Sequence, residues 1–162
     1  PDSSYGRPEE FKALIDAAHQ RGLMVLLDVV YNHFGPDGNY LGLYAPDFFT
    51  RRHATPWGAA INYDGRGPGE NSRWVREYAI GNALYWLDEF RLDGLRLDAV
   101  HAIADDSRPD LIEELATRVR QRFAGQHEMH LVLENEHNAA RYLFRDARGR
   151  PRLHTAQWND DL

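Results

Sequence analysis

The chain has 162 residues, of which 43% are hydrophobic and 27% charged, which is the composition of an ordinary globular protein. Its formal net charge is −6, so the surface is not suited to nucleic acid or anionic membranes, and we expect neither as a partner. The absence of cysteine and of long apolar runs excludes disulfides, thiolate sites and bilayer-spanning helices, and we expect a cytoplasmic protein.

Helical and strand-like segments alternate along the first half of the chain. Pro8 suits the first turn of a helix that Gly22 ends. Residues 23–30 (LMVLLDVV) form a nearly continuous apolar run, which is typical of a strand buried on both faces. Residues 34–70 have no clear periodicity but contain seven aromatic side chains, so we expect a folded excursion loop rather than a linker.

The second half of the chain continues this alternation. Trp74 and Tyr78 are among the aromatic residues expected on the apolar face of its first helix. The predicted segments are a helix over 73–90, a strand over 94–100, a helix from Pro109 to Gly125, a strand over 129–133, a helix near 137–147 and a strand over 155–158. This α/β order predicts parallel βαβ units, either in an open doubly wound sheet or in half of an eight-stranded barrel.

Three carboxylates fall at the C-terminal ends of predicted strands, where α/β folds place their active sites. They are Asp28, Asp98 and Glu134. In the segment GLRLD, Arg96 and Asp98 point to one side and the leucines to the other, so we expect Arg96 and Asp98 to face a barrel interior. An arginine there keeps neighbouring carboxylates ionised and oriented, which suits Asp98 as a nucleophile.

Glu134 ends the strand that should lie next to that of Asp98. Neighbouring strands are about 4.8 Å apart, which is compatible with the separation of about 5–5.5 Å between the two carboxyls of a retaining glycosidase. Burial and the nearby negative charge would keep Glu134 protonated, as a general acid requires.

Plainer interpretations exist for each of these residues. Asp28 also suits a helix cap, Arg96 with Asp98 a local ion pair, and Glu134 a solvated loop. His33 and His101, taken singly, also suit structural or exposed positions. The histidines and carboxylates lack the common metal-ligand spacings, so the sequence predicts no metal site.

Three segments taken together resemble signature regions of the α-amylase family of glycoside hydrolases. They are DVVYNH (28–33), GLRLDAVH (94–101) and LEN (133–135), each at a predicted strand end. The resemblance implies a partial (β/α)8 TIM barrel that runs from the end of the second βα unit through the sixth strand. Residues 1–162 would then be an incomplete catalytic domain, interrupted by the excursion loop at 34–70.

The resemblance also implies roles for individual residues. Asp98 would be the nucleophile, Glu134 the proton donor, Arg96 the group that orients Asp98, and Asp28 a support at the subsite floor. The remaining substrate-binding positions would be His33, His101, Asn159, Asp160 and Asp161. No cofactor and no metal are implied. The family's third catalytic carboxylate lies outside this sequence, so we expect residues 1–162 alone to be inactive.

Surrounding segments resemble a particular subgroup of that family. The segments TPWGAAINYDG (55–65) and QWNDD (157–161) are similar to those of enzymes that release trehalose from maltooligosyl trehalose. The implied substrate is maltooligosyl trehalose or a related α-glucan, cleaved at the α-1,4 bond next to the terminal trehalose. Two alternatives remain at this point: a glycogen branching enzyme, which is a transglycosylase, and a non-catalytic α-glucan-binding module.

Overall fold

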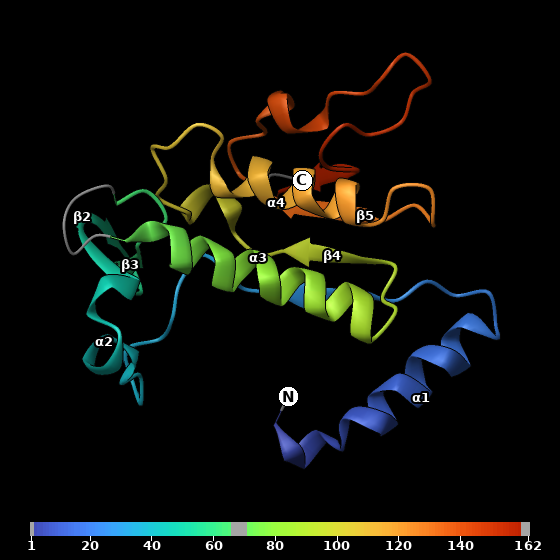
Figure 1. Cartoon of the computed structure of the whole chain (residues 1–162), viewed down its shortest axis with the longest axis horizontal. Coiled ribbons are helices and arrows are strands. Elements are labelled where there is room, and N and C mark those ends of the chain that lie inside the picture. The colour runs from blue at the N-terminus through green and yellow to red at the C-terminus, as the bar shows by residue number, and fades with distance from the viewer. Residues whose placement is uncertain (1, 66–70, 160–162) are drawn as a thin grey trace.

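The computed structural model describes residues 2–65 and 71–159 (Figure 1). Its centre is a parallel sheet with the strand order β1-β4-β5-β6. The strands are β1 (Leu26–Val29), β4 (Gly94–Leu97), β5 (His130–Glu134) and β6 (Ala156–Trp158). Each strand of this sheet pairs with the one that follows it along the chain, which is the winding of a (β/α)8 barrel. The prediction of a partial barrel is confirmed.

Helices cover one face of this sheet. α3 (Ser72–Glu89) and α4 (Leu111–Arg122) lie side by side against it in Figure 1, and α1 (Pro8–His19) packs on α3 through Phe11. The leucines of β4 and β5 point towards the helices and are almost fully buried: Leu95, Leu97, Leu131 and Leu133. Because side chains alternate along a strand, Arg96 and Glu134 point to the opposite, uncovered face, as predicted.

The predicted strand over residues 23–30 is shorter and less buried than expected. β1 comprises only Leu26–Val29, and Leu23, Met24 and Val30 are each about half exposed or more. Within the described residues β1 pairs with β4 alone, so it is an edge strand. The prediction of burial on both faces is therefore wrong for this segment.

The apolar face of α3 also differs from the prediction. Trp74 and Tyr78 are exposed, and the buried positions are Val75, Ala79, Ile80, Ala83 and Leu87. These positions follow one another at steps of four, one, three and four residues, which places them on one face of the helix, and they include small side chains that let the helix approach the sheet closely. The aromatic residues of this segment divide, because Trp74 and Tyr78 face solvent, whereas Trp86 packs on Phe11 and Phe90 is buried.

The excursion is folded over its described part, residues 34–65. It contains α2 (Leu41–Tyr44), a 3-10 turn (Pro46–Phe48) and an antiparallel hairpin of β2 (Phe49–Thr55) and β3 (Gly58–Ile61). The rings of Phe34, Phe48 and Phe49 pack edge to face and form its small core.

Three further 3-10 turns complete the elements: Ser3–Tyr5, Val100–Ala102 and Ala140–Leu143. The helix predicted near 137–147 is absent, because the described chain there holds only the turn Ala140–Leu143. Short polar side chains satisfy the backbone instead: Asn135 accepts from the amide of His137, and Asp146 accepts from the amides of Arg148 and Arg150. No helix of the described residues is both long and apolar enough to cross a membrane.

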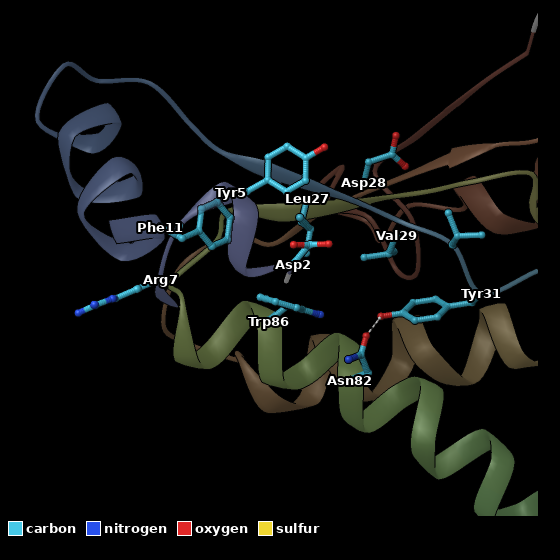
Figure 2. A pocket seen from close by; sticks show the side chains of 12 residues that line it. Asp2, Tyr5, Arg7, Phe11, Leu27, Asp28, Val29, Tyr31, Asn82 and Trp86 are labelled. Atoms are coloured by element: carbon cyan, nitrogen blue, oxygen red, sulfur yellow. Dashed lines mark hydrogen bonds between the residues drawn. The ribbon is translucent and has the colours of Figure 1, made fainter. Parts of the chain in front are cut away.

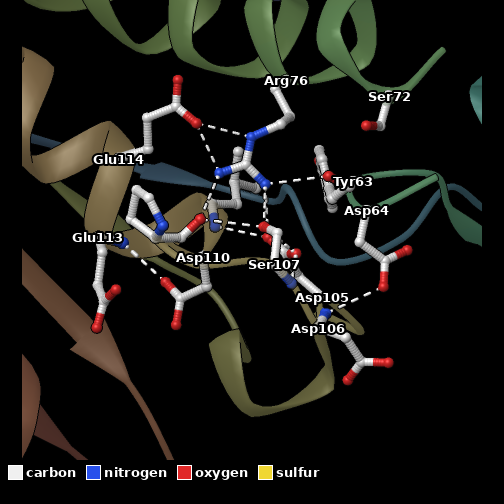
Figure 3. Close-up of polar contacts among 12 residues, drawn as sticks. Tyr63, Asp64, Ser72, Arg76, Asp105, Asp106, Ser107, Asp110, Glu113 and Glu114 are labelled. Atoms are coloured by element: carbon white, nitrogen blue, oxygen red, sulfur yellow. Dashed lines mark hydrogen bonds and ion pairs between the residues drawn. The ribbon is translucent and has the colours of Figure 1, made fainter. Parts of the chain in front are cut away.

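A buried arginine fixes the excursion to the rest of the fold. Arg76 of α3 donates to the Tyr63 carbonyl (3.0 Å), to Asp105 (2.7 Å) and Ser107 (2.9 Å) in the loop after β4, and to Glu114 of α4 (2.7 Å) (Figure 3). We refer to these five residues as the Arg76 cluster. It ties three chain segments to α3 and so holds the loops that border the carboxyl edge of the sheet.

Candidate active site

The carboxyl edge of the sheet brings the predicted charged residues together. The parallel register pairs Asp28 with Arg96 across β1 and β4. Gly94 begins β4 beside His130 of β5, and a Cβ atom at Gly94 would lie only 1.9 Å from the His130 carbonyl oxygen. The lack of a side chain at Gly94 therefore allows the close approach of the two strands that carry Arg96 and Glu134.

Arg96 is the centre of this site. Its Nη1 donates to Asp28 Oδ1 (2.7 Å) and Asp98 Oδ1 (2.6 Å), and its Nη2 donates to Glu134 Oε2 (2.7 Å). We refer to these four residues as the Arg96 cluster. One guanidinium thus holds a carboxylate from each of three successive strand ends, which is the convergence predicted from their spacing.

Asp98 is held by a second partner from the end of β1. Asn32, which is almost fully buried, donates through Nδ2 to the Asp98 carbonyl (2.8 Å) and to Asp98 Oδ2 (3.1 Å). Burial raises the pKa of Asp98, but the hydrogen bonds from Asn32 and Arg96 and the charge of Arg96 outweigh it, so the pKa lies below that of an ordinary aspartate. The cluster therefore keeps Asp98 ionised.

Glu134 is fixed by the backbone as well as by Arg96. Its Oε2 also accepts from the amide of Ala99 at 2.8 Å. Ala99 has the left-handed values φ 40° and ψ 49°, which are uncommon for a residue with a side chain. This strained turn ends β4 three residues before the predicted end at Val100 and aims the amide at Glu134.

The two predicted histidines lie at the same edge. His33 is hydrogen-bonded through Nδ1 to Asn32 Oδ1, and its ring stacks on Trp57 at 4.6 Å. His101 contacts the loop after β5, where its Nε2 lies 3.5 Å from Glu136 Oε2. His33 is thus joined to Asp98 through Asn32, and His101 is joined to the segment that follows Glu134.

The remaining predicted positions follow β6. Asn159 comes directly after Trp158 and is partly buried. Asp160 and Asp161 lie outside the described residues.

Sequence reasoning missed two contributors to this site. Asn32 was given no role of its own, and its place after β1 in DVVYNH is the signal for one. Trp158 was not assigned any role, yet the centre of its ring lies 5.2 Å from Arg96 Cζ. No sequence pattern indicates this contact, because the register that places Trp158 opposite Glu134 is seen only in the structure.

A separate groove of about 510 Å³ lies between the start of α1, β1 and α3. Figure 2 shows Phe11, Leu27 and Trp86 among its mainly apolar lining, with Asp28 at the side that meets the Arg96 cluster. Apolar side chains provide few hydrogen bonds for sugar hydroxyls, so we do not locate the candidate site in this groove.

One group of side chains has the ligand types of a cation site. His53, Asp64 and Asp106 each place a ligand atom within 4.8 Å of the others. However, Arg52 lies between the two carboxylates, with Nη1 3.2 Å from Asp64 Oδ1 and Nη2 3.7 Å from Asp106 Oδ2. The guanidinium supplies the positive charge there, so this group is best understood as a structural ion-pair network.

Comparisons with known proteins agree with this geometry. The family model for the α-amylase catalytic domain matches residues 2–45. A malto-oligosyltrehalose trehalohydrolase of Deinococcus radiodurans is 46% identical over 137 residues, covering 85% of this chain and 21% of the relative. A 1,4-alpha-glucan branching enzyme of Mycolicibacterium paratuberculosis is 42% identical over 118 residues, covering 68% of this chain and 15% of the relative.

A solved structure extends the similarity over almost the whole chain. A Salmonella typhimurium protein assigned as an α-amylase superposes with a TM-score of 0.90 at 47% identity, covering 99% of this chain and 26% of that protein. The chain thus spans about a quarter or less of the relatives it matches.

The fold and the site define a class. A parallel sheet wound in one direction, with helices outside and paired carboxylates at its carboxyl edge, is typical of a (β/α)8-barrel glycosidase. With the similarity to its relatives, this arrangement identifies the family: the chain belongs to the α-amylase family of glycoside hydrolases.

Proposed function

We propose that this chain is part of a retaining glycoside hydrolase that cleaves the α-1,4-glucosidic bond next to the terminal trehalose of maltooligosyl trehalose and releases trehalose. Residues 1–162 would be an incomplete catalytic barrel domain with its excursion at 34–70. The observation that carries the proposal is the attachment of Asp98 and Glu134 to opposite nitrogens of one arginine. The trehalohydrolase relative supports the choice of substrate.

Asp98 acts as the nucleophile in this proposal. Its lowered pKa keeps the carboxylate ionised, so it can attack the anomeric carbon and form a covalent glycosyl-enzyme. Asn32 and Arg96 restrain Oδ2 and Oδ1 respectively, so the carboxylate is already oriented before the sugar arrives.

Glu134 acts as the general acid and then as the base. It protonates the departing glycosidic oxygen and afterwards removes a proton from the water that releases the sugar with retained configuration. Its Oε2 is held by Arg96 Nη2 and by the Ala99 amide, so the carboxyl group is oriented before the sugar arrives.

The surrounding residues bind and orient the sugar. His33 and His101 hydrogen-bond its hydroxyls, Asp28 supports the floor of the subsite, and Asn159, Asp160 and Asp161 line further subsites. Trp57, stacked on His33 and partly exposed, presents a flat surface for a glucose ring. The reaction needs no cofactor, because acid, base and nucleophile are all protein side chains.

The test is product analysis with the full-length protein and maltooligosyl trehalose. We expect free trehalose and a shortened maltooligosaccharide whose newly formed end is first detected by NMR as the α anomer. New α-1,6 branches on a linear glucan would instead establish the branching-enzyme alternative. Binding of the substrate without turnover by the full-length protein would establish a glucan-binding module.

A further inference from the structure

Trp158 meets the arginine at the centre of the candidate site. It ends β6, pairs in register with Glu134, and its ring centre lies 5.2 Å from Arg96 Cζ. Two strand spacings, about 9.6 Å, separate β4 from β6, so the two side chains meet across β5. The contact therefore spans the strand that carries Glu134.

We propose that Trp158 is a positioning residue, which holds the Arg96 guanidinium in the orientation that divides it between Asp98 and Glu134. The proposal rests on the proposed function in that Asp98 and Glu134 are taken as the reacting pair. Nothing in the family comparison assigns a role to this side chain.

The hydrogen-bonding pattern of Arg96 explains why a flat partner is needed. Both terminal nitrogens of Arg96 already donate to carboxylates, whereas the faces of the guanidinium remain open to a further contact. An aromatic ring attracts a cation over its face and limits its rotation. Trp158 therefore adds a restraint that does not compete with the carboxylates for N–H groups.

The indole of Trp158 opposes rotation of the Arg96 guanidinium in one direction, towards Asp28. Asp28 and Asp98 share Nη1, whereas Glu134 alone accepts from Nη2. Asp28 lies on the edge strand β1, on the far side of Arg96 from Trp158. Without the indole, Arg96 is free to turn towards Asp28, which lengthens its contact with Glu134 and exposes the Asp98 carboxylate to water.

Other charged or titratable groups near the reacting pair, Asp98 and Glu134, lie on the neighbouring elements. Asp28 lies on β1, His33 reaches Asp98 through Asn32, and His101 lies in the turn after β4 beside Glu136. None of these groups contacts Trp158 among the described residues, so a change at Trp158 acts on the pair through Arg96.

The main experiment compares variants of the full-length protein. Trp158→Ala should lower kcat by about tenfold and move the acidic limb of the kcat/KM profile to higher pH, because the pKa of Asp98 rises when Arg96 turns away. Trp158→Phe keeps an aromatic face and should restore both quantities. Trp158→Leu keeps apolar bulk without that face and should behave like Trp158→Ala.

The chain offers a matched control. Trp74 on α3 also stacks on an arginine, with its ring centre 5.0 Å from Arg73 Cζ, but it is exposed and lies outside the site. Trp74→Ala removes the same kind of contact and should leave kcat and the pH profile unchanged.

A second measurement needs no substrate. Carbon-13 NMR titration of the labelled carboxyls should show a higher pKa for Asp98 in Trp158→Ala than in the wild type. An Asp98 pKa in Trp158→Ala equal to that of the wild type would overturn the proposal. So would a raised KM with an unmoved pH profile, or wild-type behaviour of Trp158→Leu.

If Trp158→Ala does not fold, the comparison of Trp158→Phe with Trp158→Leu tests the proposal instead. If the wild type releases no trehalose, the proposed function fails and the titration still tests Trp158.

Discussion

Two arginines organise this molecule, and they differ in what surrounds them. Arg96 holds three carboxylates on the uncovered face of the sheet, and its side chain is 21% exposed. Arg76 holds two carboxylates, a hydroxyl and two backbone carbonyls beneath the loops, and its side chain is 12% exposed. The Arg96 cluster has an excess of negative charge, whereas the Arg76 cluster is more nearly balanced.

This difference separates a site for chemistry from a structural connection. Carboxylates in excess of their cation, open to solvent, are available to a substrate. Side chains that are buried and paired on all sides fix the positions of chain segments instead. We therefore expect changes in the Arg96 cluster to alter catalysis and changes in the Arg76 cluster to alter stability.

The largest expected effect is on catalysis. Asp98→Asn in the full-length protein should lower kcat by at least about 10⁴-fold, because the nucleophile is lost. The variant should remain folded and lose only the modest stabilisation that the ionised carboxylate gains from Arg96 and Asn32, so its melting temperature should fall slightly. Wild-type turnover of maltooligosyl trehalose would contradict the assignment of Asp98.

Glu134→Gln should have a large effect that depends on the leaving group. We expect a loss of about 10²–10⁴-fold with maltooligosyl trehalose, because its departing oxygen needs a proton. A substrate with an activated aryl leaving group should lose far less, because it departs without one. Equal losses with both substrates, measured as kcat/KM, would remove Glu134 from the acid role.

Arg76→Met should act on stability. It leaves Asp105, whose side chain is only 2% exposed, without its cationic partner, and we expect a loss of about 3–5 kcal/mol in the free energy of unfolding. Urea denaturation of the full-length protein measures this. The control is Arg122→Met, which breaks an exposed pair with Asp88 and should cost less than about 1 kcal/mol. Similar losses in both variants would erase the contrast between buried and exposed pairs.

The smallest expected effect concerns acid stability. Because the pKa of Asp98 is lower in the folded protein than in the unfolded chain, its contribution to stability is fully present above about pH 4. That contribution is lost as the pH falls through the lower, folded-state value. The curve of unfolding free energy against pH should therefore be flatter below pH 4 for Asp98→Asn than for the wild type. Parallel curves would show that the Arg96 cluster does not hold Asp98 as described.

The sequence predicted the convergence at the carboxyl edge because period-two alternation fixes which side chains share a face. Arg96, Asp98 and Glu134 lie where that rule places them. Burial was harder to predict, because it depends on which neighbours a segment has. The apolar run of β1 lies at a sheet edge, and Trp74 and Tyr78 face solvent on a helix whose contact surface uses small residues.

Contacts made by side chains across strands were also beyond the sequence. Asn32 reaches Asp98 from the end of the neighbouring strand β1, and Trp158 reaches Arg96 across β5. Neither contact follows from local spacing, because each depends on the strand order and on the length of the side chains. The left-handed backbone of Ala99 was likewise unpredictable, since alanine rarely adopts it.

Gly94 sets the spacing between the two strands that carry the proposed nucleophile and the proposed acid. Its bare α-carbon sets how near the strand of the nucleophile lies to the strand of the acid. Retaining and inverting glycosidases differ chiefly in the gap between their two carboxyls, about 5 Å against about 6.5–9.5 Å. Even a methyl group there would collide with the His130 carbonyl and push the strands apart, so in the proposed reaction Gly94 would help to set the gap between the two carboxyls.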